Sequence, residues 1–405
     1  MSVIHRNAAL LAGGLVFQSG MIQLAVALGT VTIVSVTGIE GILGLGPAIF
    51  LLAGAAAVGP AGRLSDRFGR MPVIRTGFVL GTIGPVVTAL GCHLDSSVLV
   101  FLGLGLCGAA QTMVLLSRTA AAEMFPPARR ARGMSIVLFA VVSGAVWGPL
   151  VFGPMFSGRE FTPDDLVVPW LVAGLFTIAG LLVSLGVRPD PKELSRVYAE
   201  TSAGEEADAA APLREILRRP GVPTAMVGAV ASFAVMVGVM NLSGYVAVGH
   251  GHSHGDIFTI ISLHIVGMYG LVLIVGDLVD RIGRRQSIVI GLSLMALSNL
   301  ALVWLDGIVG MSLALFGLGL GWSLSYVAAT TELVGLAAPG ERGRLIGATD
   351  LVSSGCGAAL ALGGGVVYTA GGSVPLALAA CALATLPALV AAGPARVPHA
   401  APVAD

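Results

Sequence analysis

The chain alternates long apolar runs with short polar segments, and the length of those runs limits the folds open to it. Each run has about twenty residues, which is what a helix needs to cross roughly 30 Å of hydrocarbon at 1.5 Å per residue. We therefore expect an all-α membrane protein with twelve transmembrane helices. The predicted spans are 8–35, 43–62, 72–93, 96–121, 134–156, 167–187, 222–248, 256–277, 286–305, 307–333, 345–369 and 372–393.

Composition and charge agree with this class and suggest an orientation. Hydrophobic residues make up 56% of the 405 and charged residues 11%, whereas about a quarter of a soluble domain is charged. Lys and Arg accumulate in short cytoplasmic loops, and with the N-terminus inside, Arg159 alone of the 22 falls on the outer side. We expect both termini in the cytoplasm. We expect no cleaved signal peptide, because the first run is long enough to span and lacks a small-residue cleavage site.

A hydrophilic segment in the middle of the chain separates two groups of six spans that repeat each other. GRLSDRFGR at 62–70 recurs as GDLVDRIGR at 276–284, and the same offset of 214 residues places GLGL at 103–106 on GLGL at 317–320. An unbroken register of this length indicates an internal repeat. The predicted organisation is an N-terminal six-helix half (1–187), a cytoplasmic linker (188–221), a C-terminal six-helix half (222–393) and a cytoplasmic tail (394–405).

The repeated G-x-L-x-D-R-x-G-R loop resembles the signature loop of the major facilitator superfamily, a family of transporters with this layout of two pseudo-repeated halves. The resemblance covers the whole chain and implies that the charged loops latch the cytoplasmic gate; alternatively, they only fix topology. Arg118 and Glu332 occupy equivalent positions in the two halves, where they could pair across the inner gate or cap their helices. The gating candidates are Asp66, Arg67, Arg70, Asp280, Arg281, Arg284, Arg118 and Glu332.

An enzyme or an ATP-driven pump is not expected. The single lysine, Lys192, lies in the linker outside any glycine-rich loop, so no phosphate cradle is present. Transport should then draw on a gradient, without a permanently bound cofactor. The four cysteines fall within predicted spans and lack C-x-x-C spacing, so we expect no disulfide, although Cys356 is a candidate late contact for a metal.

Soft metal ligands gather in the seventh and eighth spans. Met236 and Met240 stand four apart on one, and His264 and Met268 stand four apart on the next; residues four apart share a helix face. Helix rise places the two pairs at matched depth, though the sequence does not determine whether they face each other. Neutral thioethers favour Cu(I) over zinc, and an imidazole at such depth is functional by default. Three histidines in the loop between the spans form either a capture tract or a polar spacer: His250, His252 and His254.

This constellation resembles that of the CcoA-like copper importers, a bacterial branch of the same superfamily. The resemblance implies that copper is the substrate, bound by Met236, Met240, His264 and Met268, and that it supplies assembly of cbb3-type cytochrome oxidase. It also implies the bacterial inner membrane as the location. The expected partners are the copper ion, the lipid bilayer and a cytoplasmic copper chaperone, with no nucleic acid and a monomeric chain.

Two other functions fit parts of the sequence. A proton-coupled exporter of drugs or other small organic solutes would need ionisable groups in its cavity, and Arg118, Glu332 and Asp350 are candidates. A membrane copper sensor would be supported by a missing gate motif or a large soluble domain, and neither is seen. The visible polar groups in the outer half of such a cavity are Gln18, Gln23, Asn241 and Tyr245.

Overall fold

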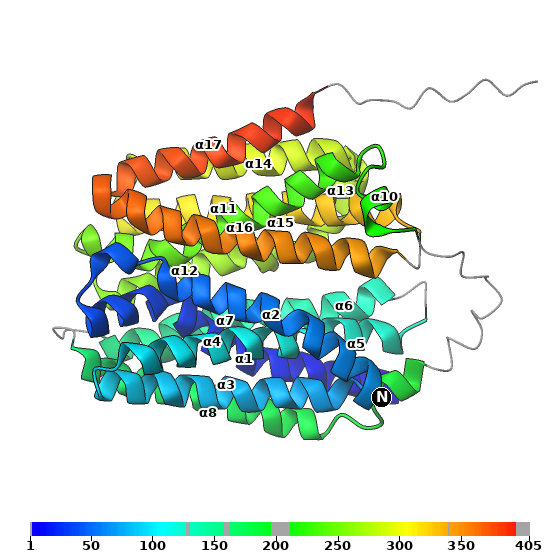
Figure 1. Ribbon diagram of the computed structural model, residues 1–405, viewed down its shortest axis with the longest axis horizontal. Helices are drawn as coiled ribbons and strands as arrows, with labels where there is room; N and C mark the ends of the chain where they lie inside the picture. The colour runs from blue at the N-terminus through cyan, green and yellow to red at the C-terminus, as the bar shows by residue number, and fades with distance from the viewer. Residues whose placement is uncertain (1, 127–129, 157–161, 196–210, 339–340, 394–405) are drawn as a thin grey trace, which may run out of the picture.

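The computed structural model describes residues 2–126, 130–156, 162–195, 211–338 and 341–393, and its elements are helices that run lengthwise in one bundle (Figure 1). Arg159, residues 196–210 of the predicted linker and the predicted tail (394–405) lie outside the described residues. The two ends of the bundle are reached alternately by successive helices, as expected for a chain that crosses a membrane repeatedly.

The first half contains six spans, of which the fifth is irregular. That span runs through α6, α7 and several 3₁₀ and π turns as far as Phe156, because Pro149 and Pro154 cannot donate helical hydrogen bonds. The helices are α1 (Val3–Thr37), α2 (Leu45–Phe68), α3 (Arg70–His93), α4 (Ser97–Leu115) continued by α5 (Ser117–Met124), α6 (Arg130–Phe139), α7 (Gly144–Trp147) and α8 (Val167–Leu185).

A short helix in the predicted linker, α10 (Leu213–Ile216), precedes the six spans of the second half. The second of these spans contains a π-helical turn, η7 (Val266–Gly270), and bends by 58° directly after it, between Gly270 and Ile274. The others are regular helices. The elements are α11 (Val222–Gly249), α12 (His254–Ile265), η7, α13 (Val272–Ile282), α14 (Arg284–Ala301), α15 (Ile308–Leu336), α16 (Arg342–Gly371) and α17 (Ser373–Ala392).

The described helices account for the predicted spans. Ten of them are long and apolar enough to cross a membrane, and the bent α12–α13 pair makes eleven. The one predicted span that remains corresponds to α14. This helix has 18 residues, and its mean hydropathy is lowered by Arg284, Arg285 and Gln286 in its first turn. The outer surface is apolar, with Leu182 of α8 62% exposed and Leu389 of α17 63% exposed. Such surfaces are unfavourable in water and favourable in lipid, so the predicted all-α membrane fold is confirmed.

Two equivalent turns mark one end of the bundle, which we call the motif end. Gly69 joins α2 to α3 with φ of 101°, and Gly283 joins α13 to α14 with φ of 98°. Side chains rarely adopt this backbone conformation, so the glycines of the repeated motif are required for the tight turn. The N-terminus lies at the same end (Figure 1). The opposite end, where η1 (Glu40–Ile42) lies, is called the far end.

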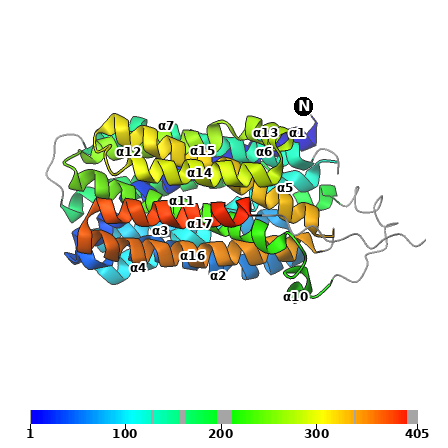
Figure 2. The same cartoon turned by 90° about the horizontal axis from the view of Figure 1, so that it is seen from above.

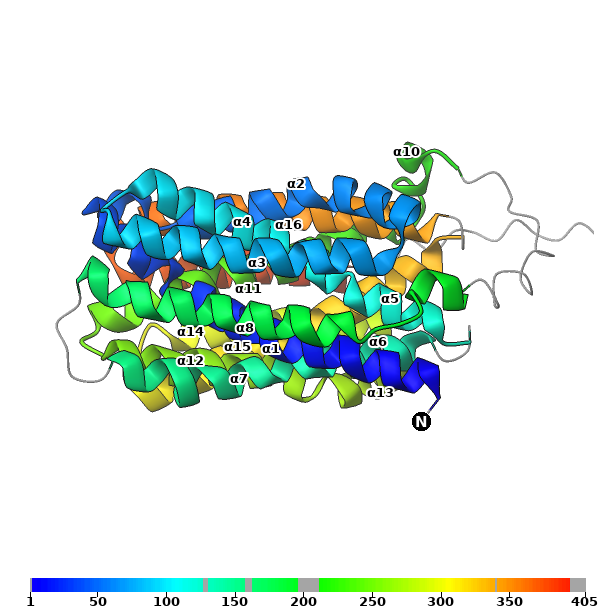
Figure 3. The same cartoon turned by 90° about the horizontal axis from the view of Figure 1, so that it is seen from below.

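The two halves touch closely toward the far end. The contacts join α1 to α11 and α2 to α16, and α2 lies beside α16 in both turned views (Figures 2 and 3). A Cβ atom added to Gly44 would stand 1.9 Å from the carbonyl oxygen of Ala361, and one added to Gly244 would stand 2.5 Å from that of Ala27. These backbones meet without room for a side chain, so the far end is closed.

An ion pair ties the segment before α11 to the loop before α16. Arg219 donates two hydrogen bonds to Glu341, at 2.6 and 2.9 Å, and the Glu341 carboxylate also accepts from the backbone N–H groups of Ala211 and Ala338. The hydrogen bonds from Arg219 and then from the backbone lower the pKa of Glu341 to about 2. The carboxylate therefore stays ionised at physiological pH and holds α10 against the second half.

Candidate functional site

A cavity of about 350 Å³ lies between the two halves. Its wall is built from α1, α2, α4 and α5 of the first half and from α11, η7, α15 and α16 of the second. Gly46 and Pro47, toward the far end, are buried, whereas Val58 is 43% exposed and Arg118 is half-buried. The cavity is therefore closed at the far end and opens toward the motif end.

Three of the four predicted metal ligands line this cavity. Met236 and Met240 come from α11, and Met268 comes from η7. Met236 and Met268 are buried, with 2% and 4% of their surface exposed. The structure thus places the three thioethers on the wall of one cavity, which the depth argument had left open.

His264 does not line that cavity, which corrects the predicted four-residue constellation. Its side chain is fully buried, and its Nδ1 lies 2.7 Å from the carbonyl oxygen of Leu315 on α15. A buried imidazole requires a hydrogen-bond partner, and α15 supplies it. The π turn at 266–270 breaks the helical period between His264 and Met268. The two residues therefore do not share one face as a regular helix would require.

A cross-half ion pair supplies the only charged side chains among the described residues that line the cavity. Arg118 of α5 lies 4.0 Å from Asp350 of α16, and both side chains are about one-third exposed. The hydroxyl of Tyr326 on α15 donates to Asp350 at 3.0 Å. Asp350 is thus held from both halves. From the sequence it was only a candidate ionisable group in the cavity, with no partner assigned.

Arg118 and Glu332 do not pair, so the first of the two alternatives for them is not what the structure shows. Glu332 lies 3.4 Å from Arg284 at the start of α14, and both groups belong to the second half. The internal repeat places Arg118 and Glu332 at equivalent positions of the two halves, but equivalence does not bring them into contact. Each carboxylate instead pairs with the arginine nearest to it.

Aromatic rings form much of the cavity wall near the ion pair, and sequence reasoning missed them. Tyr326 stacks on Trp322 with centroids 5.2 Å apart and an interplanar angle of 13°, while Tyr269 meets Trp322 edge-on at 5.6 Å. Phe50 and Phe233 add to the lining. Each ring is an ordinary residue of its own span. Only the packing of α2, α11, η7 and α15 brings the lining rings to one space, so no local pattern could have found them.

At the motif end, Arg70 is the centre of the charged cluster in the first half. Its guanidinium donates to both carboxylate oxygens of Glu123 on α5, at 2.8 and 2.9 Å, and to Asp66 at 2.9 Å. Asp190, at the start of the predicted linker, accepts from the backbone N–H groups of Arg70 and Met71. Arg67 lies over the ring of Phe68. The loop is therefore braced mainly by Glu123 and Asp190, neither of which was predicted.

The second copy of the motif is held less firmly. Arg284 pairs with Glu332 alone, and Asp280 and Arg281 form no ion pair within the described part of the chain. The two copies of the motif therefore differ in how many side chains hold them.

We expect Glu123→Gln to impair transport more than Asp66→Asn. The Asp66 side chain is 74% exposed, and an exposed pair contributes only about 0–1 kcal/mol, whereas a bidentate charge-assisted pair contributes roughly 1.5–3 kcal/mol. Uptake should fall by roughly tenfold in the first variant and by less than about fivefold in the second. Uptake normalised to membrane abundance measures both, and a larger loss in Asp66→Asn would contradict the assignment.

The three loop histidines contact different segments. The Nε2 atom of His250 lies 3.1 Å from the Ser373 hydroxyl, that of His252 lies 2.5 Å from the Asp306 carbonyl, and His254 packs against Phe156 with ring centroids 6.4 Å apart. No cluster of three His, Cys, Asp or Glu side chains able to hold a metal occurs in the described ranges. The predicted capture tract is therefore spread over three contacts, and Cys356 joins no such cluster.

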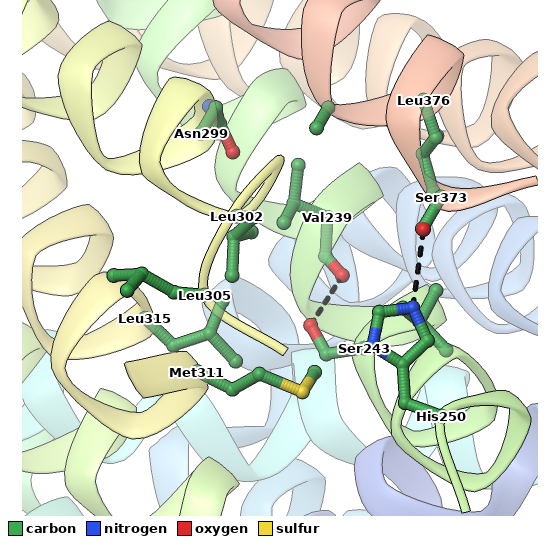
Figure 4. Close-up of a pocket in the computed structure, with 12 residues that line it drawn as sticks. Val239, Ser243, His250, Asn299, Leu302, Leu305, Met311, Leu315, Ser373 and Leu376 are labelled. Carbon is green, nitrogen blue, oxygen red and sulfur yellow. Dashed lines mark hydrogen bonds between the residues drawn. The ribbon is translucent and has the colours of Figure 1, made fainter. Parts of the chain in front are cut away.

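A second, smaller cavity lies in the second half beside His250 (Figure 4). Its volume is about 30 Å³, and its wall includes Ser243, Asn299 and Met311. The amide of Asn299 is fully buried without a hydrogen-bond partner among the described residues. A water molecule needs roughly 10–15 Å³ of such volume, so this cavity suits one or two ordered waters and is too small for an organic solute.

Comparison with known proteins identifies the family. The model of the Major Facilitator Superfamily matches residues 9–362. The uncharacterized MFS-type transporter YdeG of Bacillus subtilis is 27% identical over 350 residues, which cover 85% of this chain and 81% of that protein. The riboflavin transporter RfnT of Brucella anthropi is 29% identical over 315 residues, which cover 76% of this chain and 75% of that protein.

Solved structures show the same fold. A D-xylose-proton symporter superimposes with a TM-score of 0.76 at 17% identity, covering 96% of this chain and 97% of that one. The human organic anion transporter MFSD10 superimposes with a TM-score of 0.66 at 17% identity, covering 96% and 99%. Since the family model spans most of the sequence, the chain belongs to the Major Facilitator Superfamily and is a secondary transporter rather than an enzyme.

Proposed function

We propose that this transporter carries a flat organic solute through the central cavity by alternating access, with Asp350 as the proton-binding group. The observation that carries the proposal is the aromatic wall beside a cross-half ion pair, formed by Phe50, Phe233, Tyr269, Tyr326, Arg118 and Asp350. Small-molecule sites have volumes of about 300–1,000 Å³ and combine apolar walls with a few polar groups. The cavity, at about 350 Å³, meets both conditions.

The walls favour a ring system over a sugar. Stacked and edge-on aromatic pairs offer flat apolar faces, and the three cavity methionines add polarizable sulfur that contacts rings well. A relative of similar length is a riboflavin transporter, and the three-ring system of riboflavin has the flatness that these walls fit. Riboflavin is therefore the first solute to test.

The ion pair supports proton coupling. Protonation of Asp350 would neutralise the partner of Arg118 and remove the one electrostatic link between the halves inside the cavity, so proton binding and the movement of the halves would be coupled. The hydroxyl of Tyr326 joins the same carboxylate to the aromatic wall. A solute stacked on Tyr326 would therefore contact the residue that hydrogen-bonds Asp350, and solute binding could affect proton binding.

We expect Tyr326→Leu to weaken riboflavin uptake by about tenfold or more, since losing a stacking face and a hydrogen bond costs on the order of 1.4 kcal/mol. Trp304→Leu is the matched control, because this aromatic residue is 70% exposed and away from the cavity. Uptake of labelled riboflavin into proteoliposomes measures both variants. Equal uptake in wild type, Tyr326→Leu and empty vesicles would overturn the proposal.

Copper import is a second candidate, favoured by one observation: the thioethers of Met236, Met240 and Met268 line the same cavity. Three neutral sulfur ligands suit Cu(I). In this reading the protein would lie in a bacterial inner membrane with both termini cytoplasmic, pass copper to a cytoplasmic chaperone and supply cbb3-type oxidase assembly. His264 is not among the residues that line this cavity, which weakens this reading, although its Nε2 has no hydrogen-bond partner among the described residues while Nδ1 lies against the Leu315 carbonyl.

If copper is the substrate, Met268→Leu should lower copper accumulation by about tenfold, because a thioether on the path is deleted at nearly constant volume. Met295→Leu is the matched control, since Met295 is also fully buried but does not line the cavity. Radiocopper uptake normalised to protein abundance decides the matter. Equal copper uptake in both variants and in wild type would show that the methionines do not bind copper and only line a cavity for an organic solute.

A further inference from the structure

A side chamber of about 90 Å³ adjoins the central cavity on the α1 side. Met240, Met268 and Tyr269 line both spaces, so the chamber lies directly beside the central cavity. The chamber also contains two glutamines of α1, Gln18 and Gln23. The sequence indicated these two residues as polar groups in a cavity without giving them a role.

Both glutamine side chains are buried, and in the described part of the chain each has a hydrogen-bond partner for only one of its two polar atoms. Gln18 is 1% exposed and Gln23 is fully buried. The Gln18 side-chain nitrogen donates to Gln111 at 3.3 Å and that of Gln23 donates to Ser262 at 3.4 Å, while the Oε1 atoms of both lack a hydrogen-bond partner among the described residues. If either amide were turned over, its nitrogen would be the free atom instead. In every arrangement each glutamine keeps one buried polar atom for a partner that the protein does not supply.

The cost of leaving such atoms unpaired indicates a ligand. Buried polar groups are nearly always hydrogen-bonded, and burying one without a partner is unfavourable. Gly148 leaves room for the Gln23 amide, because a Cβ there would stand 2.5 Å from the Gln23 nitrogen. The chamber is large enough for ordered water, which a solute could displace if it reproduced the same hydrogen bonds.

The remaining wall limits what the solute can be. No charged side chain lines the chamber within the described ranges, so a charged group would enter without compensation. Apart from Ser19, Gly144 and the three glutamines Gln18, Gln23 and Gln111, the lining is apolar, so the solute must offer flat apolar faces and a polar edge. A sugar does not fit, because its hydroxyls point in several directions. The apolar lining residues are Leu15, Ile22, Val26, Val141, Met240, Ile265 and Met268, with Tyr269 beside them.

We propose that this chamber is a binding subsite for the lactam or imide edge of a planar heterocycle, read by Gln18 and Gln23, while the rest of the ring system lies against Tyr269 and Tyr326. An imide edge carries an N–H donor between carbonyl acceptors, which is complementary to the side-chain amide of glutamine. The proposal rests on the proposed transport of a flat organic solute. It adds which part of the solute is recognised and by which residues.

The test compares ring compounds that differ only in the imide N–H. One pair is riboflavin and 3-methylriboflavin; the other is theobromine and caffeine, in which the imide N–H of the first is methylated in the second. Purified full-length protein in detergent should bind the N–H member of each pair at least about tenfold more tightly, a difference of ~1.4 kcal/mol. Gln23→Leu should bring the two affinities within about twofold, whereas Gln286→Leu, a glutamine exposed on α14, should keep the preference.

The ratio of two affinities measured on one sample does not depend on how much of a variant folds, so a destabilised variant still gives an answer. If all four compounds bind with no preference for the N–H member, or if Gln18→Leu and Gln23→Leu both keep the wild-type preference, the imide subsite is overturned and the aromatic cavity stands. If none of the four compounds binds to wild type, the proposed transport of flat solutes fails and the subsite fails with it.

Discussion

Asp350→Asn is expected to abolish proton-driven accumulation of solute while exchange of solute across the membrane continues. Asp350 is the only carboxylate among the described residues that line the central cavity. Asparagine keeps its shape and can still accept the Tyr326 hydrogen bond, but it cannot bind or release a proton. With one proton per solute, each pH unit supplies about 1.4 kcal/mol and drives roughly tenfold accumulation. The variant should show no accumulation at any pH gradient.

Glu332→Gln provides the control for this experiment. Glu332 is a half-buried carboxylate paired with an arginine, as Asp350 is, but it does not line the cavity. Uptake into proteoliposomes with an imposed pH gradient, compared with exchange at equal pH, separates coupling from movement of the halves. Retained tenfold accumulation in Asp350→Asn, or loss of exchange together with accumulation, would show that Asp350 is not the coupling group.

The helices could be predicted because their main determinant is local. An apolar run of about twenty residues must be helical in lipid, where every backbone group needs an internal partner. The run marks only the part inside hydrocarbon, which explains the errors at the ends. The second span was predicted to end at residue 62, whereas α2 continues to Phe68, because the polar residues of the motif extend the helix into water.

The depth of the site residues in the membrane could be predicted from the sequence, but the side of the helix on which each one lies could not. Helix rise placed Met236 level with Met268 and Met240 level with His264, and the three methionines line one cavity. The side of a helix that faces the cavity is set by neighbouring helices and by irregular turns. The π turn at 266–270 redirects this span, so His264 faces Leu315 while Met268 reaches the cavity. No residue in that turn is proline, and its sequence gives no local signal of the break.

Pairing between distant segments was the least predictable feature. Arg118 and Asp350 are brought together by packing of the two halves, whereas the internal repeat suggested Glu332 only as one of two alternatives for Arg118. A repeat relates positions by symmetry, whereas an ion pair needs proximity. The same reason explains why the contribution of Phe233 and Tyr326 to one wall was missed.

Gly44→Leu is expected to reduce transport by at least about tenfold by opening the far end. The Gly44 backbone is in an ordinary right-handed helical conformation, so a side chain is tolerated locally. A Cβ there would stand 1.9 Å from the Ala361 carbonyl oxygen on α16, however, and so would force α2 and α16 apart. Overpacking of this kind costs roughly 1–3 kcal/mol, which shifts a two-state equilibrium by about 5- to 150-fold. The shift should favour the state that is open at the far end.

Gly41→Leu is the matched control, because a Cβ on Gly41 meets no atom within 4 Å and its backbone has no positive φ. Hydrogen exchange measures the gate directly: amides of the first turn of α2 and of residues 361–366 in α16 should exchange faster in Gly44→Leu and remain unchanged in Gly41→Leu. Aromatic stacking of Phe152 and Phe156 on Phe258 closes the same end on the α12 side, with centroids 5.8 and 5.7 Å apart. If the far end is one gate, amides of α12 should respond together with those of α16. Faster exchange confined to α2 would instead mean that Gly44 affects only local packing.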